Sequence, residues 1–182
     1  MNIIQTNIEG VVILEPRIFC DERGYFFESF SKKWFRENVC DTHFVQDNES
    51  KSCYGVLRGL HFQKPPFAQA KLVRVITGKI LDIAVDICEN SPTFGKYVSV
   101  ELSEENKRQL FIPRGFAHAF VVLSDEAVVQ YKCDNYYAPE YESGISWNDP
   151  ALNIDWKIPT KDIILSEKDK SLPPLSHQIP LI

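Results

Sequence analysis

The stretch GVLRGLHFQKPPFAQAKLVRVI, from Gly55 to Ile76, combines strand-forming residues with basic side chains. Its two runs of apolar and β-branched residues, at 56–62 and 71–76, predict two half-buried strands. Pro65 and Pro66 exclude a helix between the runs and predict a loop. The stretch therefore predicts two β-strands rather than a helix.

Three cationic or titratable side chains, Arg58, His61 and Lys71, lie within these predicted strands, where a buried charge is expensive. Strict alternation would turn Arg58 and His61 to opposite faces of one strand. Both could act in one pocket if Gly59 forms a bulge, or if Arg58 lies at the mouth of the strand. A salt-bridged surface strand is the alternative interpretation of this stretch.

Short apolar runs separated by turns continue along the rest of the chain. Turn residues recur about every ten residues, which is typical of an all-β sandwich or barrel. A short helix is predicted at 32–38, where Ser31 can act as the N-cap, and single helical turns are predicted at 103–107 and 166–170. Further strands are predicted at 8–16, 26–30, 44–48, 80–87, 97–102, 110–113, 117–123 and 126–133.

The size and composition of the chain limit the classes of protein to which it can belong. Its 182 residues, 44% hydrophobic and 25% charged, predict one domain spanning residues 1–182 with a real core. The net charge of −5 argues against nucleic acid or an anionic membrane as the main partner. An anionic small molecule is still compatible, since it needs only a few local cations.

The cysteine pattern predicts a reducing compartment. Five cysteines are scattered without a CxxC pair, which indicates free thiols rather than a disulfide framework. The N-terminal sequence has no signal-peptide pattern, because its apolar run Val11 to Leu14 is closed by Glu15 and Pro16. No window reaches the ~20 apolar residues of a membrane helix. We therefore expect a soluble, cytoplasmic protein.

A metal site is the first chemistry to consider. The segment PRGFAH, 113–118, resembles the second motif of the cupin jelly rolls, in which the histidine, here His118, binds a metal. The first cupin motif supplies two histidines and a glutamate, whereas His61 has neither a second histidine nor a glutamate at the required spacing. Two imidazoles alone make a poor transition-metal site. A cupin-like fold without a metal is the better interpretation.

Acid–base chemistry fits the sequence better. His61 is the natural base, because an imidazole exchanges its proton near neutral pH. Such a base needs a carboxylate that orients its second nitrogen, and the spacing of residues does not identify one. Tyr131 could present its hydroxyl as an acid, or it could simply belong to the core.

Nucleophilic catalysis and nucleotide hydrolysis are less well supported. Ser124 and Ser143 lack a G-x-S-x-G setting, and no Gly-rich phosphate loop precedes a helix. An anion would have to be bound by side chains such as Arg23, Arg58 and Lys168, each of which could equally be a solvated surface cation.

Several longer segments together resemble the dTDP-4-dehydrorhamnose 3,5-epimerase family, from Arg23 to Asp169. The resemblance implies an all-β, metal-free cupin jelly roll with a few short helices. It also implies cofactor-independent epimerisation of dTDP-4-dehydro-6-deoxy-D-glucose at C3 and C5 in dTDP-L-rhamnose biosynthesis. The segments that carry the resemblance are RGYFFESF, GVLRGLHFQ, AQAKLVRVITGKILDIAVDI, SPTFGK, LFIPRGFAHAF, YKCDNYYAPEYESGISWNDP and SEKD.

The same resemblance implies the roles of individual residues. His61 would be the base and Asp169 its dyad partner, Tyr131 the acid on the opposite face of the sugar, and Lys71 the cation beside the keto oxygen. Tyr136 would stack on thymine. Further contacts to the nucleotide sugar would come from Arg23, Glu28, Gln46, Asn48, Arg58, His118, Glu142 and Lys168.

The family is usually a homodimer in which the RGYFFESF strand crosses to the neighbouring subunit, so Arg23 and Glu28 would serve the partner's site. Cys88 and Ala119 depart from the family pattern, which usually has arginine and glycine there. Three other interpretations are open: an enzyme that epimerises one carbon or isomerises the ketone of a related sugar, a nucleotide-sugar binder without activity, and a metal-dependent cupin oxygenase.

Overall fold

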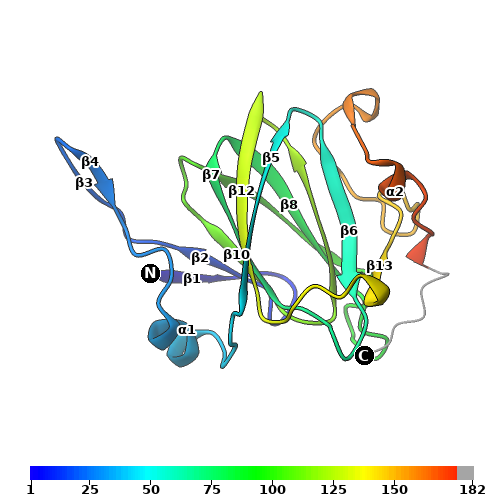
Figure 1. The fold of residues 1–182 in the computed structure, drawn as a ribbon, viewed down its shortest axis with the longest axis horizontal. Coiled ribbons are helices and arrows are strands. Elements are labelled where there is room, and N and C mark those ends of the chain that lie inside the picture. The colour runs from blue at the N-terminus through cyan, green and yellow to red at the C-terminus, as the bar shows by residue number, and fades with distance from the viewer. Residues whose placement is uncertain (176–182) are drawn as a thin grey trace.

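Two antiparallel β-sheets pack face to face in the computed structural model, which describes residues 1–175 (Figure 1). The six-stranded sheet has, in spatial order, β1 (Asn2–Gln5), β2 (Val12–Glu15), β10 (Gln109–Ile112), β7 (Lys71–Thr77), β12 (Glu126–Cys133) and β5 (Gln46–Cys53). The five-stranded sheet has β13 (Glu142–Gly144), β6 (Leu57–Gln63), β11 (Phe116–Val122), β8 (Lys79–Asp86) and β9 (Tyr97–Ser103). This two-sheet, mostly β architecture confirms the predicted fold class.

Short elements complete the described chain. A hairpin of β3 (Phe19–Asp21) and β4 (Gly24–Phe26) forms a separate two-stranded sheet. The helices are α1 (Lys32–Asn38) and α2 (Glu167–Lys170), with 3-10 turns at Pro139–Tyr141 and Thr160–Asp162. Within residues 1–175, no helix is long and apolar enough to cross a membrane. The predicted domain runs to residue 182, and residues 176–182 lie outside the described part.

The core lies between the two sheets and on both outer faces. β8 and β11 are buried along almost their whole length, since apolar layers cover both faces of the five-stranded sheet. Its outer face is covered by the segment after β13, including Ile145, Leu152 and Trp156. The outer face of the six-stranded sheet packs against α1. There Phe35 packs edge-on against Phe111 of β10, with 5.2 Å between the ring centres.

Several predicted elements have the predicted bounds, and others do not. Helix α1 is confirmed, with Ser31 as its N-cap accepting a hydrogen bond from Trp34 N. The predicted strand 8–16 is wrong before Val12, because a turn built on Gly10, with φ of +83°, joins β1 to β2. The predicted single helical turn at 103–107 is present as one turn, closed by Lys107 N donating to the carbonyl oxygen of Ser103 at 3.1 Å, and it does not continue into a helix.

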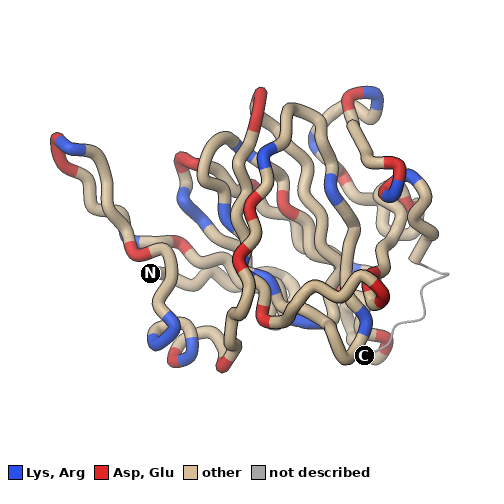
Figure 2. The backbone as a smooth tube through the Cα atoms, in the orientation of Figure 1, with Lys and Arg blue, Asp and Glu red and all other residues tan. Residues whose placement is uncertain are grey.

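The predicted strand at 26–30 is displaced toward the N-terminus. The chain reverses at 21–24, where Asp21 accepts a hydrogen bond from Arg23 N and Gly24 has φ of +126°. The result is the β3–β4 hairpin, which projects from the body of the molecule (Figure 1). Its tip carries acidic and basic residues together (Figure 2), and its shaft exposes Phe19, Tyr25 and Phe26, the last at 69%.

Candidate active site

A β-bulge in β6 decides which side chains enter the cavity between the sheets. β6 pairs with β11 so that His61 is opposite His118 and Arg58 is opposite Phe120, which leaves one extra residue on β6. Alternation is therefore reset at Gly59, and Arg58 and His61 line the same cavity. The bulge, one of the two arrangements predicted from sequence, is confirmed.

Only glycine fits at the bulge. Gly59 has φ of +122°, a backbone conformation that side chains disfavour. A Cβ there would lie 2.5 Å from the carbonyl oxygen of His118 and 2.6 Å from Cβ of Ala119. The close approach of β6 to β11 thus depends on the absence of a side chain at Gly59, and Ala119 is the residue it approaches.

The cavity opens between the two sheets and is bounded on one side by the α2 segment. Its volume is about 460 Å³, and a smaller pocket of about 240 Å³ adjoins it, sharing His61, Lys71 and Tyr131. The larger cavity is lined by Ser50, Val56, Leu57, Arg58, His61, Lys71, His118, Phe120, Tyr131, Ile164, Leu165, Ser166, Lys168 and Asp169.

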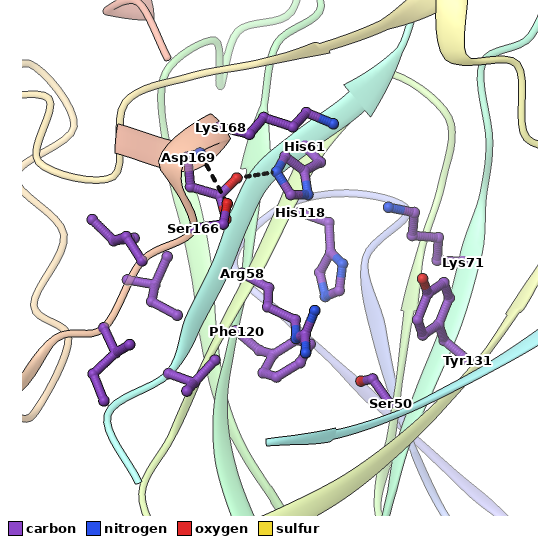
Figure 3. Close-up of a pocket in the computed structure, with 14 residues that line it drawn as sticks. Ser50, Arg58, His61, Lys71, His118, Phe120, Tyr131, Ser166, Lys168 and Asp169 are labelled. Carbon is purple, nitrogen blue, oxygen red and sulfur yellow. Dashed lines mark hydrogen bonds and ion pairs between the residues drawn. The ribbon is translucent and has the colours of Figure 1, made fainter. Parts of the chain in front are cut away.

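His61 and Asp169 form a hydrogen-bonded pair on one side of the cavity (Figure 3). His61 Nε2 is 2.5 Å from Oδ1 of Asp169, whose side chain is buried. Ser166 caps α2 by accepting a hydrogen bond from Asp169 N at 3.1 Å, which fixes the backbone that carries the carboxylate. Burial favours a higher pKa for the Asp169 carboxyl, but the hydrogen bond and charge of His61 outweigh it, so its pKa lies below the ordinary value.

Lys71 and Tyr131 lie on the opposite side, on the neighbouring strands β7 and β12 (Figure 3). Lys71 Nζ is 5.9 Å from the centre of the Tyr131 ring. Burial lowers the pKa of Lys71, while the nearby Cys133, Asp82 and Glu142 oppose the shift. Burial raises the pKa of the Tyr131 hydroxyl, so it holds its proton more tightly than a free phenol.

His118 lies between these two groups (Figure 3). Its Nε2 is 2.7 Å from Oδ1 of Asp82, a buried carboxylate on β8. Burial lowers the pKa of His118, and the positive charges of Lys71 and His61 lower it further, while Asp82 opposes the shift. The imidazole is therefore held toward its neutral form.

Polar side chains surround the mouth of the cavity. Arg58 Nε donates to Oγ of Ser52 at 3.1 Å, which restrains the guanidinium. Lys168 Nζ is 2.5 Å from Oε2 of Glu142, so α2 is tied to β13 across the mouth. Gln46 and Asn48 are hydrogen-bonded to one another and line the smaller pocket.

The structure thus brings together ten of the side chains that the sequence singled out. They line one or both of the adjoining pockets: His61, Lys71, Tyr131, Asp169, Gln46, Asn48, Arg58, His118, Glu142 and Lys168.

Three candidate residues lie outside these pockets. Arg23, at the tip of the hairpin, is paired with Asp21 at 2.5 Å and has a side chain 84% exposed. Glu28 is exposed on the segment after β4. Tyr136 is 62% exposed, and its place in the pocket is taken by its neighbour Tyr137, whose hydroxyl donates to Glu142 at 2.6 Å.

Gln63 explains which tyrosine faces the pocket. Its amide donates to the carbonyl oxygen of Tyr136 and accepts from Ala138 N, at 3.1 and 2.7 Å. These two bonds fix the backbone on either side of Tyr137, whose ring then lines the smaller pocket. The prediction that Tyr136 is the stacking aromatic therefore has no support in this geometry, because Tyr137 and not Tyr136 lines the pocket.

Several residues that line the cavity or contact a lining residue were not singled out from sequence. Ser50 continues the inward row of Gln46 and Asn48 along β5, and simple alternation would have found it. Asp82 interrupts the apolar run of β8, which is an indication of function that the sequence does carry. Among residues 1–175, no group of three or more His, Cys, Asp or Glu side chains is placed to hold a metal ion.

Comparisons with known proteins agree with one another. The family model described as dTDP-4-dehydrorhamnose 3,5-epimerase matches residues 5–177. The dTDP-4-dehydrorhamnose 3,5-epimerase of Escherichia coli K12 is 54% identical over 182 residues, covering 100% of this chain and 98% of the relative.

Solved structures agree as well. The crystal structure of dTDP-4-dehydrorhamnose 3,5-epimerase from Elizabethkingia anophelis has a TM-score of 0.93 and 55% identity, covering 97% of each chain. The Legionella pneumophila dTDP-6-deoxy-D-glucose-3,5-epimerase, solved in complex with dTDP-4-keto-L-rhamnose, has a TM-score of 0.94 and 51% identity, covering 97% of this chain and 93% of its own. A family model that spans almost the whole chain, together with relatives above 50% identity at full length, leaves one assignment: the chain belongs to the dTDP-4-dehydrorhamnose 3,5-epimerase family.

Proposed function

We propose that this chain converts dTDP-4-dehydro-6-deoxy-D-glucose to dTDP-4-dehydro-L-rhamnose by inverting C3 and C5, a step in dTDP-L-rhamnose biosynthesis. The observation that carries the proposal is the position of His61 and Tyr131, which enter one cavity from opposite sheets with Lys71 beside them. Family membership supports the same isomerase activity.

The C4 ketone of this substrate acidifies the protons on both neighbouring carbons, C3 and C5. Removal of either proton leaves an enolate whose charge lies mostly on the C4 oxygen. A cation held at that oxygen stabilises the transition state more than the ground state. Lys71 is the cation that we assign to this role, since it is fixed between the two sheets and close to acidic groups that help to keep it charged.

Inversion requires a proton to leave one face of the ring and another to arrive on the opposite face. We assign proton removal to His61, whose hydrogen bond to Asp169 orients the ring and stabilises the imidazolium once it forms. We assign proton delivery to Tyr131, which keeps its proton because burial raises its pKa. One site can act on both carbons, because C3 and C5 flank the same carbonyl group.

The nucleotide part of the substrate would lie toward the mouth of the cavity. Arg58 is a suitable ligand for the diphosphate, and Lys168 is a second cation at the mouth. We assign stacking on thymine to Tyr137 rather than Tyr136, because only Tyr137 of the two lines the pocket. Binding energy from these remote groups positions the reacting sugar ring.

We further propose a homodimer in which the β3–β4 hairpin reaches the neighbouring subunit. Exposed aromatic side chains on a projecting hairpin are a surface that a partner chain would cover. Arg23 and Glu28, which lie outside this chain's own pockets, would then contact substrate in the partner's cavity. The five unpaired thiols support a cytoplasmic location.

The proposal is tested by incubation of the protein with dTDP-4-dehydro-6-deoxyglucose in deuterated water, followed by proton NMR of the product. Deuterium should enter both C3 and C5, and both centres should invert. Deuterium at one carbon alone would indicate a single-centre epimerase, and movement of the keto group would indicate a ketoisomerase. Binding without any exchange would leave only a nucleotide-sugar binder.

A further inference from the structure

A second histidine–carboxylate pair lies beneath the cavity floor, in a layer that is mostly apolar. Asp82 is 0% exposed, and its oxygen Oδ1 is 2.7 Å from Nε2 of His118. Its neighbours two residues away on β8, Ile80 and Ala84, belong to the apolar core between the sheets. Since side chains alternate along a strand, the Asp82 carboxylate points into the same core.

Packing does not account for a carboxylate at this place. Within the described chain, His118 is the one hydrogen-bond partner of the Asp82 side chain, and its second oxygen, Oδ2, is buried without a partner. Burial of an incompletely paired carboxylate opposes folding, and an uncharged residue of similar size would fill the layer without that cost. A costly buried group beside a cavity indicates a role in the chemistry of the cavity.

The two nitrogens of His118 have different surroundings. Nε2 is bonded to Asp82, whereas Nδ1 has no hydrogen-bond partner among residues 1–175. The ring lines the cavity, so Nδ1 is the nitrogen that a ligand can reach. A neutral imidazole has one N–H donor and one acceptor nitrogen, and donation from Nε2 to the carboxylate leaves Nδ1 as the acceptor.

We propose that Asp82 is a positioning residue that holds His118 as its Nε2–H tautomer, so that the Nδ1 lone pair accepts a hydrogen bond from a hydroxyl group of the substrate sugar. This inference rests on the proposed function, from which the keto-sugar class of substrate is taken. The ammonium of Lys71 can only donate, and Nδ1 of His118 then only accepts.

The two groups together distinguish a carbonyl oxygen from a hydroxyl. A ketone has lone pairs but no proton to give, so it suits Lys71 and is repelled by a lone pair at Nδ1. A hydroxyl group can satisfy His118. A sugar turned so that its ketone faced His118 would leave two acceptors in contact, which disfavours that orientation. Asp82 would therefore help to direct the C4 carbonyl toward Lys71.

The tautomer can be observed in the unmodified protein. The chain has four histidines, and ¹⁵N-histidine labelling with long-range ¹H–¹⁵N spectra identifies which ring nitrogens carry protons. The His118 signals are assigned by their absence in His118→Gln. We expect His118 at neutral pH to be protonated at Nε2 and not at Nδ1. A proton on Nδ1, alone or together with one on Nε2, would overturn the proposal.

Kinetics of Asp82→Asn provide the second test. An amide is a weaker acceptor than a carboxylate and can also donate to Nε2, so both tautomers should become populated in the spectra. We expect kcat/KM to fall at least about tenfold, as when an outer partner of a functional histidine is lost. The thermal unfolding midpoint should stay the same or rise, because a buried charge is removed.

Asp86→Asn is the matched control. Asp86 is also buried on β8, but it bonds Cys88 N and the hydroxyls of Ser91 and Thr93, away from the cavity. That variant should unfold at a lower temperature and keep its kcat/KM. If the native chain epimerises the substrate and Asp82→Asn keeps the full kcat/KM, the role of Asp82 is overturned. A native chain that does not epimerise would instead overturn the proposed function.

Discussion

His61 and Tyr131 enter the same cavity from opposite sheets, His61 from β6 and Tyr131 from β12. The face-to-face packing of the sheets therefore sets the separation of the proposed base and acid, and neither strand could place both groups alone. A planar enolate between them would meet the imidazole on one face and the phenol on the other. This arrangement separates the two halves of the reaction, so each half can be removed by a different substitution.

His61→Ala should abolish proton removal. Loss of a positioned general base costs about 10³-fold in rate, and deuterium should then enter neither C3 nor C5. Binding of the nucleotide dTDP should be retained, because Arg58 and Lys168 are unchanged. Rapid solvent exchange at either carbon in this variant, measured by NMR, would show that another residue is the base.

Tyr131→Phe should give a different result. His61 can still remove a proton and return it to the same face, so deuterium should enter without inversion. We expect the rate of inversion to fall about 10²-fold or more, with solvent exchange less affected, as measured on the same NMR samples. Inversion at the full rate would remove Tyr131 from the proposed mechanism.

The pH dependence of turnover should identify Lys71. Its pKa is lowered by burial, so the ammonium is lost at a pH below that at which an exposed lysine titrates, and kcat should fall as pH rises through that lowered value. Cys133 titrates later, since burial raises its pKa to about 11, and burial also raises the pKa of Tyr131.

The lowered pKa of Lys71 also affects the stability of the folded chain. The unfolded chain binds the Lys71 proton more tightly than the folded chain, so the free energy of unfolding should gain from this residue as pH rises between the two pKa values. Lys71→Met should abolish turnover and should also remove this rise in the free energy of unfolding with pH. Thermal unfolding at several pH values measures the change in stability. An unchanged pH dependence of stability in Lys71→Met would contradict the assignment.

Gly59→Ala should disrupt the bulge that brings Arg58 and His61 together. The added methyl group would meet the backbone of β11 at 2.5 Å and force an unfavourable φ, with a cost of about 4 kcal/mol in the free energy of unfolding from strain and overpacking. Urea unfolding measures the loss.

Gly24→Ala is the control for this substitution. Gly24 has a similar φ, +126°, but no atom within 4 Å of an added Cβ. It should cost only about 1 kcal/mol. Equal losses in the two variants would mean that backbone conformation, and not the contact with β11, makes glycine necessary at 59.

Most of the strands, helix α1 and the possibility of a bulge at Gly59 could be predicted because each depends on local pattern, whereas β1 and β13 were not predicted. Alternation, turn residues and a serine N-cap are properties of neighbouring residues. The pairing of His61 with Asp169 could not be worked out from spacing, since the two are 108 positions apart. Only the resemblance to the family predicted this pair, because the two residues meet only when the folded chain brings α2 against β6.

Tyr136, which the resemblance to the family singled out, lies outside the pockets, whereas its neighbour Tyr137 lines the smaller one. The side chain that faces the pocket is selected by the amide of Gln63, which bonds the backbone on both sides of Tyr137. Those bonds span more than 70 positions of sequence, so no pattern within NYY distinguishes the two tyrosines. Likewise, the hairpin is displaced from its predicted bounds because Asp21 and Gly24 start the turn earlier.

Mixing two inactive variants should test whether the hairpin serves a partner's cavity. Arg23→Ala damages the proposed contribution of the hairpin, and His61→Ala damages the cavity. In a mixed dimer, the intact hairpin of the His61→Ala chain would complete the intact cavity of the Arg23→Ala chain. Half of the dimers would be mixed and each would have one intact site, so activity should recover to about a quarter of the native value.

The control uses both substitutions on one chain, mixed with the native chain after the same unfolding and refolding. Each mixed dimer then pairs an intact hairpin with a damaged cavity and a damaged hairpin with an intact cavity, so mixing should add no activity beyond that of the native homodimers. Light scattering should give the mass of two chains for every sample. If mixed dimers form in the first mixture but no activity is recovered, Arg23 does not contribute to the neighbouring site. Each cavity would then be completed by its own chain.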